Sequence, residues 1–146
     1  MAYTVKKVEV WAIDVQNRPG TLARILEGLT QAGAQLEFVV ARQVSENTSR
    51  VFLSPLKGKK QKDRATELGL RPAAGMSSIR IDGPDRAGLG CDIARAVAAN
   101  GINIRGASAA VIGRKMTFYL AFKTANEAVA AAKVIRKALR TTKRKR

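Results

Sequence analysis

The sequence contains one short motif twice, 68 residues apart, as Asn17-Arg18-Pro19-Gly20-Thr21-Leu22 and as Asp85-Arg86-Ala87-Gly88-Leu89. The same offset aligns Asp14 with Asp82, Ile25 with Ile93, Gly33 with Gly101 and, as a near match, Gln35 with Asn103. The matches fall on turn glycines and apolar positions, where backbone geometry and packing permit the fewest substitutions. This internal repeat predicts two copies of one structural unit.

Hydrophobic patterning places the motif between a strand and a helix in both copies. Period-two alternation predicts strands, and apolar residues three and four apart predict amphipathic helices that end at Gly33 and Gly101. In the first copy we expect strands over 8–13, 35–44 and 49–54, with a turn at 45–48 and a helix that contains residues 22–29 and stops at Gly33. In the second copy we expect strands over 79–82, 102–111 and 115–123, with helices over 88–100 and 125–141.

The lysine-rich segment 56–75 separates the two copies and is predicted to be a linker region. A short helix is expected around residues 63–68, and residues 69–72 offer a short strand. Each copy then has the order β-α-β-β-α, which predicts an α+β protein with antiparallel sheets and helices on one face of each sheet. The expected domains are 1–72 and 73–140, followed by a basic tail, 141–146.

The two motifs and the segments after their helices, Gly33-Ala34-Gln35-Leu36 and Asn100-Gly101-Ile102-Asn103-Ile104, resemble the ACT domain. This small regulatory module is attached to many enzymes of amino-acid metabolism. The first copy is especially similar to the serine-sensing ACT domain of phosphoglycerate dehydrogenase, whose loop also carries an Asn-Arg-Pro-Gly run. The resemblance implies two ferredoxin-like βαββαβ units in tandem. The fourth strand of that pattern is not evident in either copy, and without it the first strand of each copy would be an exposed edge.

The resemblance also implies a site for a small amino acid or related metabolite between ACT units, at the loop after the first strand and the start of the second strand. A glycine-rich loop that enters a helix presents free backbone N–H groups to a carboxylate, and an amide or carboxylate side chain can accept from the α-ammonium group. The residues carried over are Asn17, Arg18, Pro19, Gly20 and Gln35 in the first copy, and Asp85, Arg86, Gly88 and Asn103 in the second.

A structural interpretation of these residues stays open beside the ligand-binding one. Asn17 and Asp85 precede helices, so they are also candidates for simple helix caps, and Gly20 and Gly88 for turn residues. Arg18 and Arg86 either pair with a ligand carboxylate or are solvated loop residues.

Composition excludes most enzyme chemistry. The 146 residues include no histidine and a single cysteine, Cys91, so a Ser-His-Asp triad, a Cys-His pair, a His-ligated zinc site and an internal disulfide are all impossible. We expect Cys91 to be a small buried residue, and the spacing of Asp82, Asp85 and Asp92 matches no calcium loop. The sequence therefore predicts no enzyme, no metal and no cofactor, in a cytoplasmic protein without a membrane-spanning segment.

The charge of the chain points to a second function. The 27 basic and 11 acidic residues give a net charge of +16, and the excess is concentrated toward the C-terminus. The basic residues are either simply solvated, or they form a surface that binds nucleic acid or an acidic protein. The candidate polyanion-binding residues are Lys133, Arg136, Lys137, Arg140, Lys143, Arg144, Lys145 and Arg146. Other expected partners are a second copy of the chain, in a homodimer or higher oligomer, and an enzyme or transcription factor that responds to the ligand.

Overall fold

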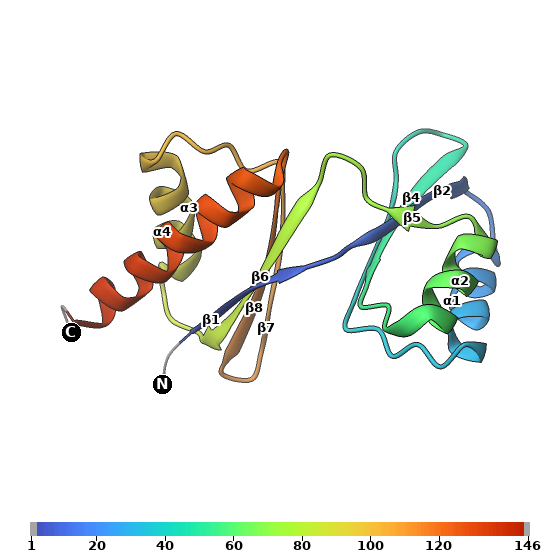
Figure 1. Cartoon of the computed structure of the whole chain (residues 1–146), viewed down its shortest axis with the longest axis horizontal. Coiled ribbons are helices and arrows are strands. Elements are labelled where there is room, and N and C mark those ends of the chain that lie inside the picture. Colours follow the sequence, from blue (N-terminus) through green and yellow to red (C-terminus); the bar gives the residue numbers. More distant parts are fainter. Residues whose placement is uncertain (1–2, 145–146) are drawn as a thin grey trace. The chain divides into compact units, whose positions relative to one another are not determined.

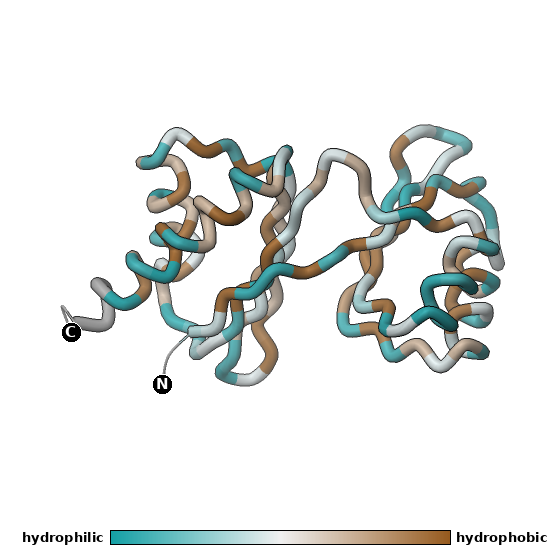
Figure 2. Tube along the Cα trace, viewed as in Figure 1, coloured by the Kyte–Doolittle hydropathy of each residue, from teal (hydrophilic) through white to brown (hydrophobic). Residues whose placement is uncertain are grey.

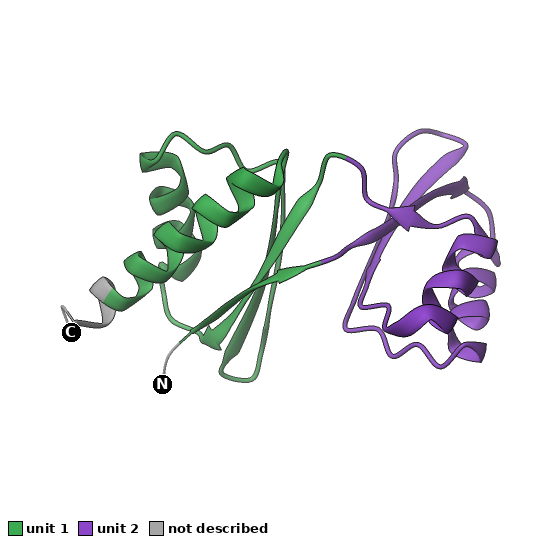
Figure 3. Ribbon diagram, viewed as in Figure 1, with its two compact units in different colours: residues 1–8, 75–146 green, residues 9–74 purple. Residues whose placement is uncertain are grey.

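A computed structural model describes the backbone of residues 3–144 and side chains as far as residue 140. The chain forms two units, each with a four-stranded antiparallel sheet and two helices (Figure 1). Unit 1 comprises residues 1–8 and 75–146, and unit 2 comprises residues 9–74 (Figure 3). The predicted α+β class with tandem units is confirmed.

Unit 2 has the order β2-α1-β3-β4-α2-β5, with the strands arranged β3-β4-β2-β5 in the sheet. Its helices pack on one face around a core of Trp11, Ile25, Leu29, Val51, Leu53, Leu56, Ala65 and Leu70. The elements are β2 (Trp11–Gln16), α1 (Thr21–Gln31), β3 (Phe38–Gln43), β4 (Thr48–Ser54), α2 (Gly58–Leu68) and β5 (Arg71–Pro72).

Unit 1 has the order β6-α3-β7-β8-α4, and β1 from the start of the chain completes its sheet as β1-β6-β8-β7. Ile81, Ile93, Leu120, Phe122 and Ile135 are fully buried in its core. The elements are β1 (Thr4–Val8), β6 (Ser77–Pro84), α3 (Leu89–Ala99), β7 (Gly106–Ile112), β8 (Lys115–Phe122) and α4 (Ala125–Arg144).

The fourth strands of the two units come from different places in the chain. In unit 2 it is β5, inside the short strand expected at 69–72, which pairs with β2 at Trp11 and Ala12. In unit 1 it is β1, which pairs with β6 over five residues, from Thr4 opposite Asp82 to Val8 opposite Ser78. β6 is therefore not an exposed edge, and β2 is covered at Trp11 and Ala12.

The predicted strand over 8–13 is wrong, because the chain passes from one sheet to the other at Glu9 and Val10. Alternation reports which residues face a core but not which sheet they join. The predicted first domain, 1–72, is corrected in the same way, since residues 1–8 belong to unit 1, which resumes at residue 75 after unit 2.

The predicted linker 56–75 is also corrected, although the short helix expected around residues 63–68 lies within α2. Of the predicted basic tail, residues 141–144 belong to α4, and residues 145–146 lie outside the described residues. Residues 58–68 form helix α2, in which Ala65 is buried while most other positions are polar, so its composition hides the helical pattern (Figure 2). Helix α4 continues to Arg144, past the expected end at residue 141. No helix in the described part of the chain is long and apolar enough to cross a membrane.

Candidate functional site

The two motif loops have the same backbone conformation. Gly20 and Gly88, which directly precede α1 and α3, have φ angles of 88° and 80°. This left-handed conformation disfavours residues with a Cβ atom. A Cβ atom built on either glycine would meet nothing within 4 Å, so the space above each loop is open. The two glycines are required by the backbone, and they leave room for a ligand.

The hydrogen bonds of the two loops also repeat with the 68-residue offset. The first amide of each helix donates to the arginine carbonyl of its loop, and the fourth amide donates to the glycine carbonyl. The bonds are Thr21 to Arg18 (3.4 Å) and Arg24 to Gly20 (3.0 Å) in unit 2, and Leu89 to Arg86 (3.3 Å) and Asp92 to Gly88 (2.9 Å) in unit 1. The internal repeat therefore extends to individual backbone contacts.

Two backbone donors remain at the start of each helix. The first four N–H groups of an α-helix have no partner within the helix. Those of Leu22 and Ala23 in α1, and of Gly90 and Cys91 in α3, donate to no acceptor in the described part of the chain. Together with the helix dipole, each pair favours a bound anion such as a carboxylate.

Asn17 and Asp85 are not helix caps in the structure, because the cap positions are Gly20 and Gly88 and no side chain caps either helix. The Asn17 N–H donates to the Asn47 carbonyl (2.9 Å), and its Oδ1 accepts from the Ser49 hydroxyl (3.1 Å). The Asp85 N–H donates to the Arg114 carbonyl (2.8 Å). Both residues instead fix their loop to the neighbouring β-hairpin.

The two loop arginines have different environments. Arg86 donates to the Asp92 carboxylate at 2.7 Å, and its side chain is only 15% exposed. Arg18 is exposed and forms no ion pair among the described residues. Sequence reasoning missed the ion pair of Arg86, although Asp92 lies in the first turn of α3, six residues after Arg86. Only Arg18 can therefore turn toward a ligand without breaking an internal contact.

Pro19, Gln35 and Asn103 are exposed, and neither of the two amide side chains hydrogen-bonds within the described structure. Gln35 lies between α1 and β3, and Asn103 lies between α3 and β7. Gln35 lies in the same unit as the Gly20 loop, and Asn103 lies in the same unit as the Gly88 loop. Neither amide side chain hydrogen-bonds to that loop among the described residues.

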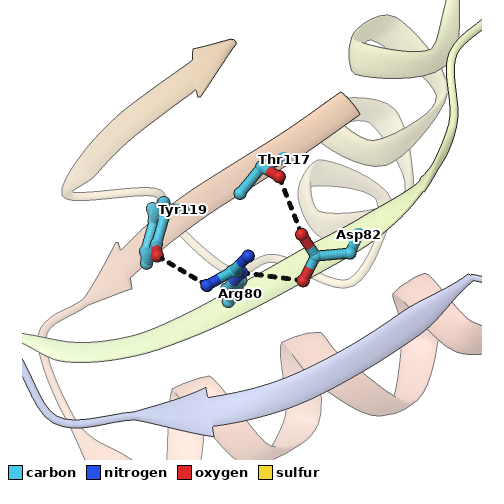
Figure 4. A network of polar contacts seen from close by, with 4 residues as sticks. All are labelled: Arg80, Asp82, Thr117 and Tyr119. Atoms are coloured by element: carbon cyan, nitrogen blue, oxygen red, sulfur yellow. Dashed lines mark hydrogen bonds and ion pairs between the residues drawn. The ribbon is translucent and has the colours of Figure 1, made fainter. Parts of the chain in front are cut away.

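A polar network lies on β6 and β8, close to the loop of unit 1 (Figure 4). Arg80 donates to Asp82 (2.8 Å) and to the Tyr119 hydroxyl (3.2 Å), and Thr117 donates to Asp82 (2.7 Å). Burial alone would raise the pKa of Asp82, but the hydrogen bonds and the charge of Arg80 outweigh it, so the pKa is lowered. The network ties the end of β6, where the loop begins, to β8.

This network predicts a loss of stability in acid. Because the pKa of Asp82 is lower in the folded chain, its contribution is present above its ordinary value of 3.8 and is lost as pH falls through the lowered pKa. At pH 7, Asp82→Asn should reduce the free energy of unfolding by about 1–3 kcal/mol. The difference from wild type should shrink below pH 4 in urea unfolding curves. A difference that is constant from pH 7 to pH 2 would show that ionisation of Asp82 does not matter.

The predicted polyanion-binding residues lie on α4, with Lys133, Arg136, Lys137 and Arg140 exposed. The Arg136 guanidinium, however, donates to the Val5 carbonyl of β1 at 2.6 Å, so this residue holds the fourth strand of unit 1. Lys143 and Arg144 continue the helix, their side chains being outside the described structure, and Lys145 and Arg146 are outside it altogether.

Neither cysteine nor acidic residues provide a further site. Cys91 is exposed, which corrects the expectation that it is buried, because its place in the first turn of α3 faces away from the core. No cluster of three His, Cys, Asp or Glu residues that could hold a metal occurs among the described residues.

Comparison with protein-family models gives a match for the second copy. Residues 77–140 match the ACT domain family. The matched segment contains the Gly88 loop, helices α3 and α4 and the β6–β8 network. No curated protein shows significant sequence similarity to the chain. The ACT-domain match therefore rests on unit 1, and unit 2 shares its fold and its loop geometry.

Solved structures with the same tandem fold span nearly the whole chain. A protein from Bacteroides thetaiotaomicron, BT0572, has a TM-score of 0.76 at 11% identity, with 88% of each chain covered. The regulatory subunit of aspartate kinase from Thermus thermophilus has a TM-score of 0.66 at 15% identity, over 94% of this chain and 97% of that one. The allosteric aspartate kinase of Clostridium acetobutylicum has a TM-score of 0.61 at 18% identity, over 94% and 34%. At these identities the likeness establishes the two-unit fold alone.

Proposed function

We propose that the chain is a non-catalytic regulatory protein that binds a small amino acid at its strand-to-helix loops. The observation that carries this proposal is the duplicated loop, in which a left-handed glycine leads into a helix with two backbone N–H donors left over. The ACT-domain match supports it, as do the regulatory aspartate kinase structures that share the fold.

The ligand carboxylate binds to the free amides of α1 or α3 in this proposal. Two converging N–H donors at a helix N-terminus favour an anion, and the absence of a Cβ atom on Gly20 or Gly88 permits close approach. Arg18 adds a cation beside the loop of unit 2, whereas Arg86 is held by Asp92 in unit 1.

The ligand ammonium group is the second requirement, and the loops meet it differently. The amide oxygen of Asn17 accepts one bond from Ser49 and has a second lone pair for an ammonium donor. Asp85 offers a carboxylate, which is a stronger acceptor for a cation but repels the carboxylate of the ligand. Gln35 and Asn103 complete the proposed sets. We infer that the loop of unit 2 suits a neutral amino acid better.

The proposed assembly is a homodimer or higher oligomer, because ligands of ACT domains are expected between two units. Binding regulates a partner enzyme or transcription factor only if the ligand favours one arrangement of the protein over another. The coupling is reciprocal, so the partner changes the affinity for the ligand by the same factor by which the ligand changes the affinity for the partner.

A thermal-shift screen against the twenty amino acids at fixed salt tests the proposal, with serine included because of the resemblance of the first copy. A ligand at 100 times its Kd should stabilise the fold by about 2.7 kcal/mol. Asn17→Ala or Asp85→Ala should abolish the shift, according to which loop binds. If no amino acid shifts the melting temperature at millimolar concentrations, the proposal fails.

Matched glycine variants provide the control for backbone strain. Gly20→Ala and Gly88→Ala place a methyl group in the open space above each loop, and Gly113→Ala places one in the turn between β7 and β8. All three glycines have positive φ and no neighbour within 4 Å of the added Cβ atom. Each variant should lose about 1–2 kcal/mol of stability, but only a loop variant should weaken ligand binding.

A further inference from the structure

We propose that the exposed face of helices α3 and α4 in unit 1 binds the phosphate backbone of nucleic acid without sequence preference. The face is defined by Arg95, Lys133, Lys137 and Arg140. It is separate from the loops proposed to bind an amino acid, and it makes a different kind of contact.

The net charge of the chain is concentrated in one unit. Unit 1 has 17 basic and 4 acidic residues, a net charge of +13, and unit 2 has 10 basic and 7 acidic residues, a net charge of +3. The two units have the same fold, so the fold itself does not require one unit to be much more positively charged than the other. The positive charge of unit 1 therefore calls for a separate explanation.

Part of this charge lies along one stripe of α4. Lys133, Lys137 and Arg140 are exposed at spacings of four and three residues, while Ala128, Ile135 and Leu139 are buried against the sheet. At 1.5 Å per residue, the three cations span about 10 Å along the helix axis. Glu127 is the only acidic residue of α4 and lies two turns before the stripe. The stripe thus presents one sign of charge to an extended polyanion.

A groove between α3 and α4 widens this basic face. It has a volume of about 480 Å³, and Arg95 from α3 and Lys137 from α4 contribute to its lining. Asp92 also lines the groove, but its carboxylate already accepts from Arg86. Arg95 thereby extends the basic face from α4 across the groove.

The equivalent groove of unit 2 has balanced charges. It lies between α1 and α2, has a volume of about 360 Å³, and is lined by Lys60, Asp63, Arg64 and Glu67 among others. The Arg64 guanidinium bonds to Glu67 and, across the groove, to Gln31 at 3.0 Å. Of these two grooves, the groove of unit 1 therefore has the excess of cations.

The chemistry of the face favours nucleic acid over an acidic protein or a membrane. Protein interfaces depend on a central apolar or aromatic cluster. Val129, which is 66% exposed, is the only large apolar residue exposed on the described parts of α3 and α4. The apolar side of α4 is buried in the core, so the helix cannot insert that side into lipid. A phosphate backbone, by contrast, is recognised mainly through charge.

Fluorescence anisotropy with a labelled 20-base-pair DNA duplex, measured from 50 to 200 mM salt, tests the proposal on the full chain. The triple variant Lys133→Gln, Lys137→Gln, Arg140→Gln should weaken binding at least tenfold at 100 mM salt. It should also reduce the slope of log K against log salt by about 2.7, which is 0.9 for each lost phosphate contact. The melting temperature checks that the variant retains the fold.

The matched control removes the same charge from the equivalent helix of unit 2 and its preceding residue. Lys57→Gln, Lys60→Gln, Lys62→Gln should change affinity less than threefold. Equal losses from both triple variants would mean that only net charge matters, and would overturn the proposal. It would be overturned as well by no binding at 50 mM salt, or by poly-glutamate competing as well as unlabelled duplex.

Discussion

Val5→Asp is expected to destabilise unit 1 by about 3–5 kcal/mol, although all of unit 2 lies between residue 5 and the rest of unit 1 in the sequence. Val5 is 8% exposed and belongs to the core cluster that includes Ile81 and Phe122. An aspartate at this position has no cationic partner in that cluster, so it either remains charged at high cost or takes up a proton. The strand that completes the sheet would then separate from β6.

Additional contacts make β1 more than a peripheral strand. The Tyr3 hydroxyl donates to the Pro84 carbonyl at 2.7 Å, and Arg136 donates to the Val5 carbonyl. Loss of β1 would leave β6 as an edge strand, beside the start of the Gly88 loop. Destabilisation of the strand should therefore also loosen the candidate site of unit 1.

Hydrogen exchange and urea unfolding together measure this effect. Amides of β6 and β8 should exchange much faster in Val5→Asp, while the fluorescence of Trp11, the only tryptophan, reports on the core of unit 2. Lys7→Asp places the same side chain at an exposed position of the same strand and should be nearly neutral. If both variants protect β6 as well as wild type does, the placement of β1 in unit 1 is wrong.

Leu120→Ala and Leu53→Ala should each cost about 2–5 kcal/mol of unfolding free energy. Both side chains are fully buried, Leu120 on β8 in unit 1 and Leu53 on β4 in unit 2. Each truncation leaves a cavity in one of the two hydrophobic clusters, which share no residue. Ile112→Ala, at a position that is 80% exposed, should change stability by less than about 0.5 kcal/mol.

The probe distinguishes the two leucine variants. Urea unfolding followed by Trp11 fluorescence should shift in Leu53→Ala, because Trp11 is in the same cluster. Far-UV circular dichroism, which reports on both units, should detect the loss in Leu120→Ala. The assignment of two cores would be contradicted if the tryptophan transition shifted only in Leu120→Ala.

The sequence predicts the repeat and the two loops well because their determinants are local. The turn before each helix and the turn after it require a left-handed backbone conformation, which favours glycine. Gly20 and Gly33 therefore mark these turns in the first copy, and Gly88 and Gly101 mark them in the second. The strands and helices between them follow from hydrophobic periodicity. These features depend on a few neighbouring residues and not on the rest of the chain.

The exchange of β1 could not be predicted because pairing between distant strands has no local signature. Val8 and Val10 belong to one alternating run, yet the chain changes sheets between them. Helix α2 was predicted only in part, as a short helix around residues 63–68, since a helix with one buried residue, Ala65, otherwise looks like a charged linker. Contacts of arginine with distant groups, such as Arg136 with Val5, depend on the tertiary fold and were missed.

The candidate site was predicted at the level of the loop but not of the side chains. Asn17 and Asp85 are predicted as ligand groups or as helix caps. Neither is a cap, because both residues join their loop to a hairpin, and their role in ligand binding stays a prediction. The equivalence of Arg18 and Arg86 ends with Asp92, whose counterpart at the 68-residue offset is Arg24. One acidic residue therefore makes the two loops chemically different.

The most direct test of amino-acid binding is an amide NMR titration of the full chain with the amino acid that raises the melting temperature most. The free N–H donors at the start of the helices should shift most, either Leu22 and Ala23 in α1 or Gly90 and Cys91 in α3. The same titration of Gly113→Ala should give the same shifts, and that of the matching loop variant, Gly20→Ala or Gly88→Ala, should lose them. Shifts confined to other parts of the chain, or none at saturating ligand, would contradict the proposed function.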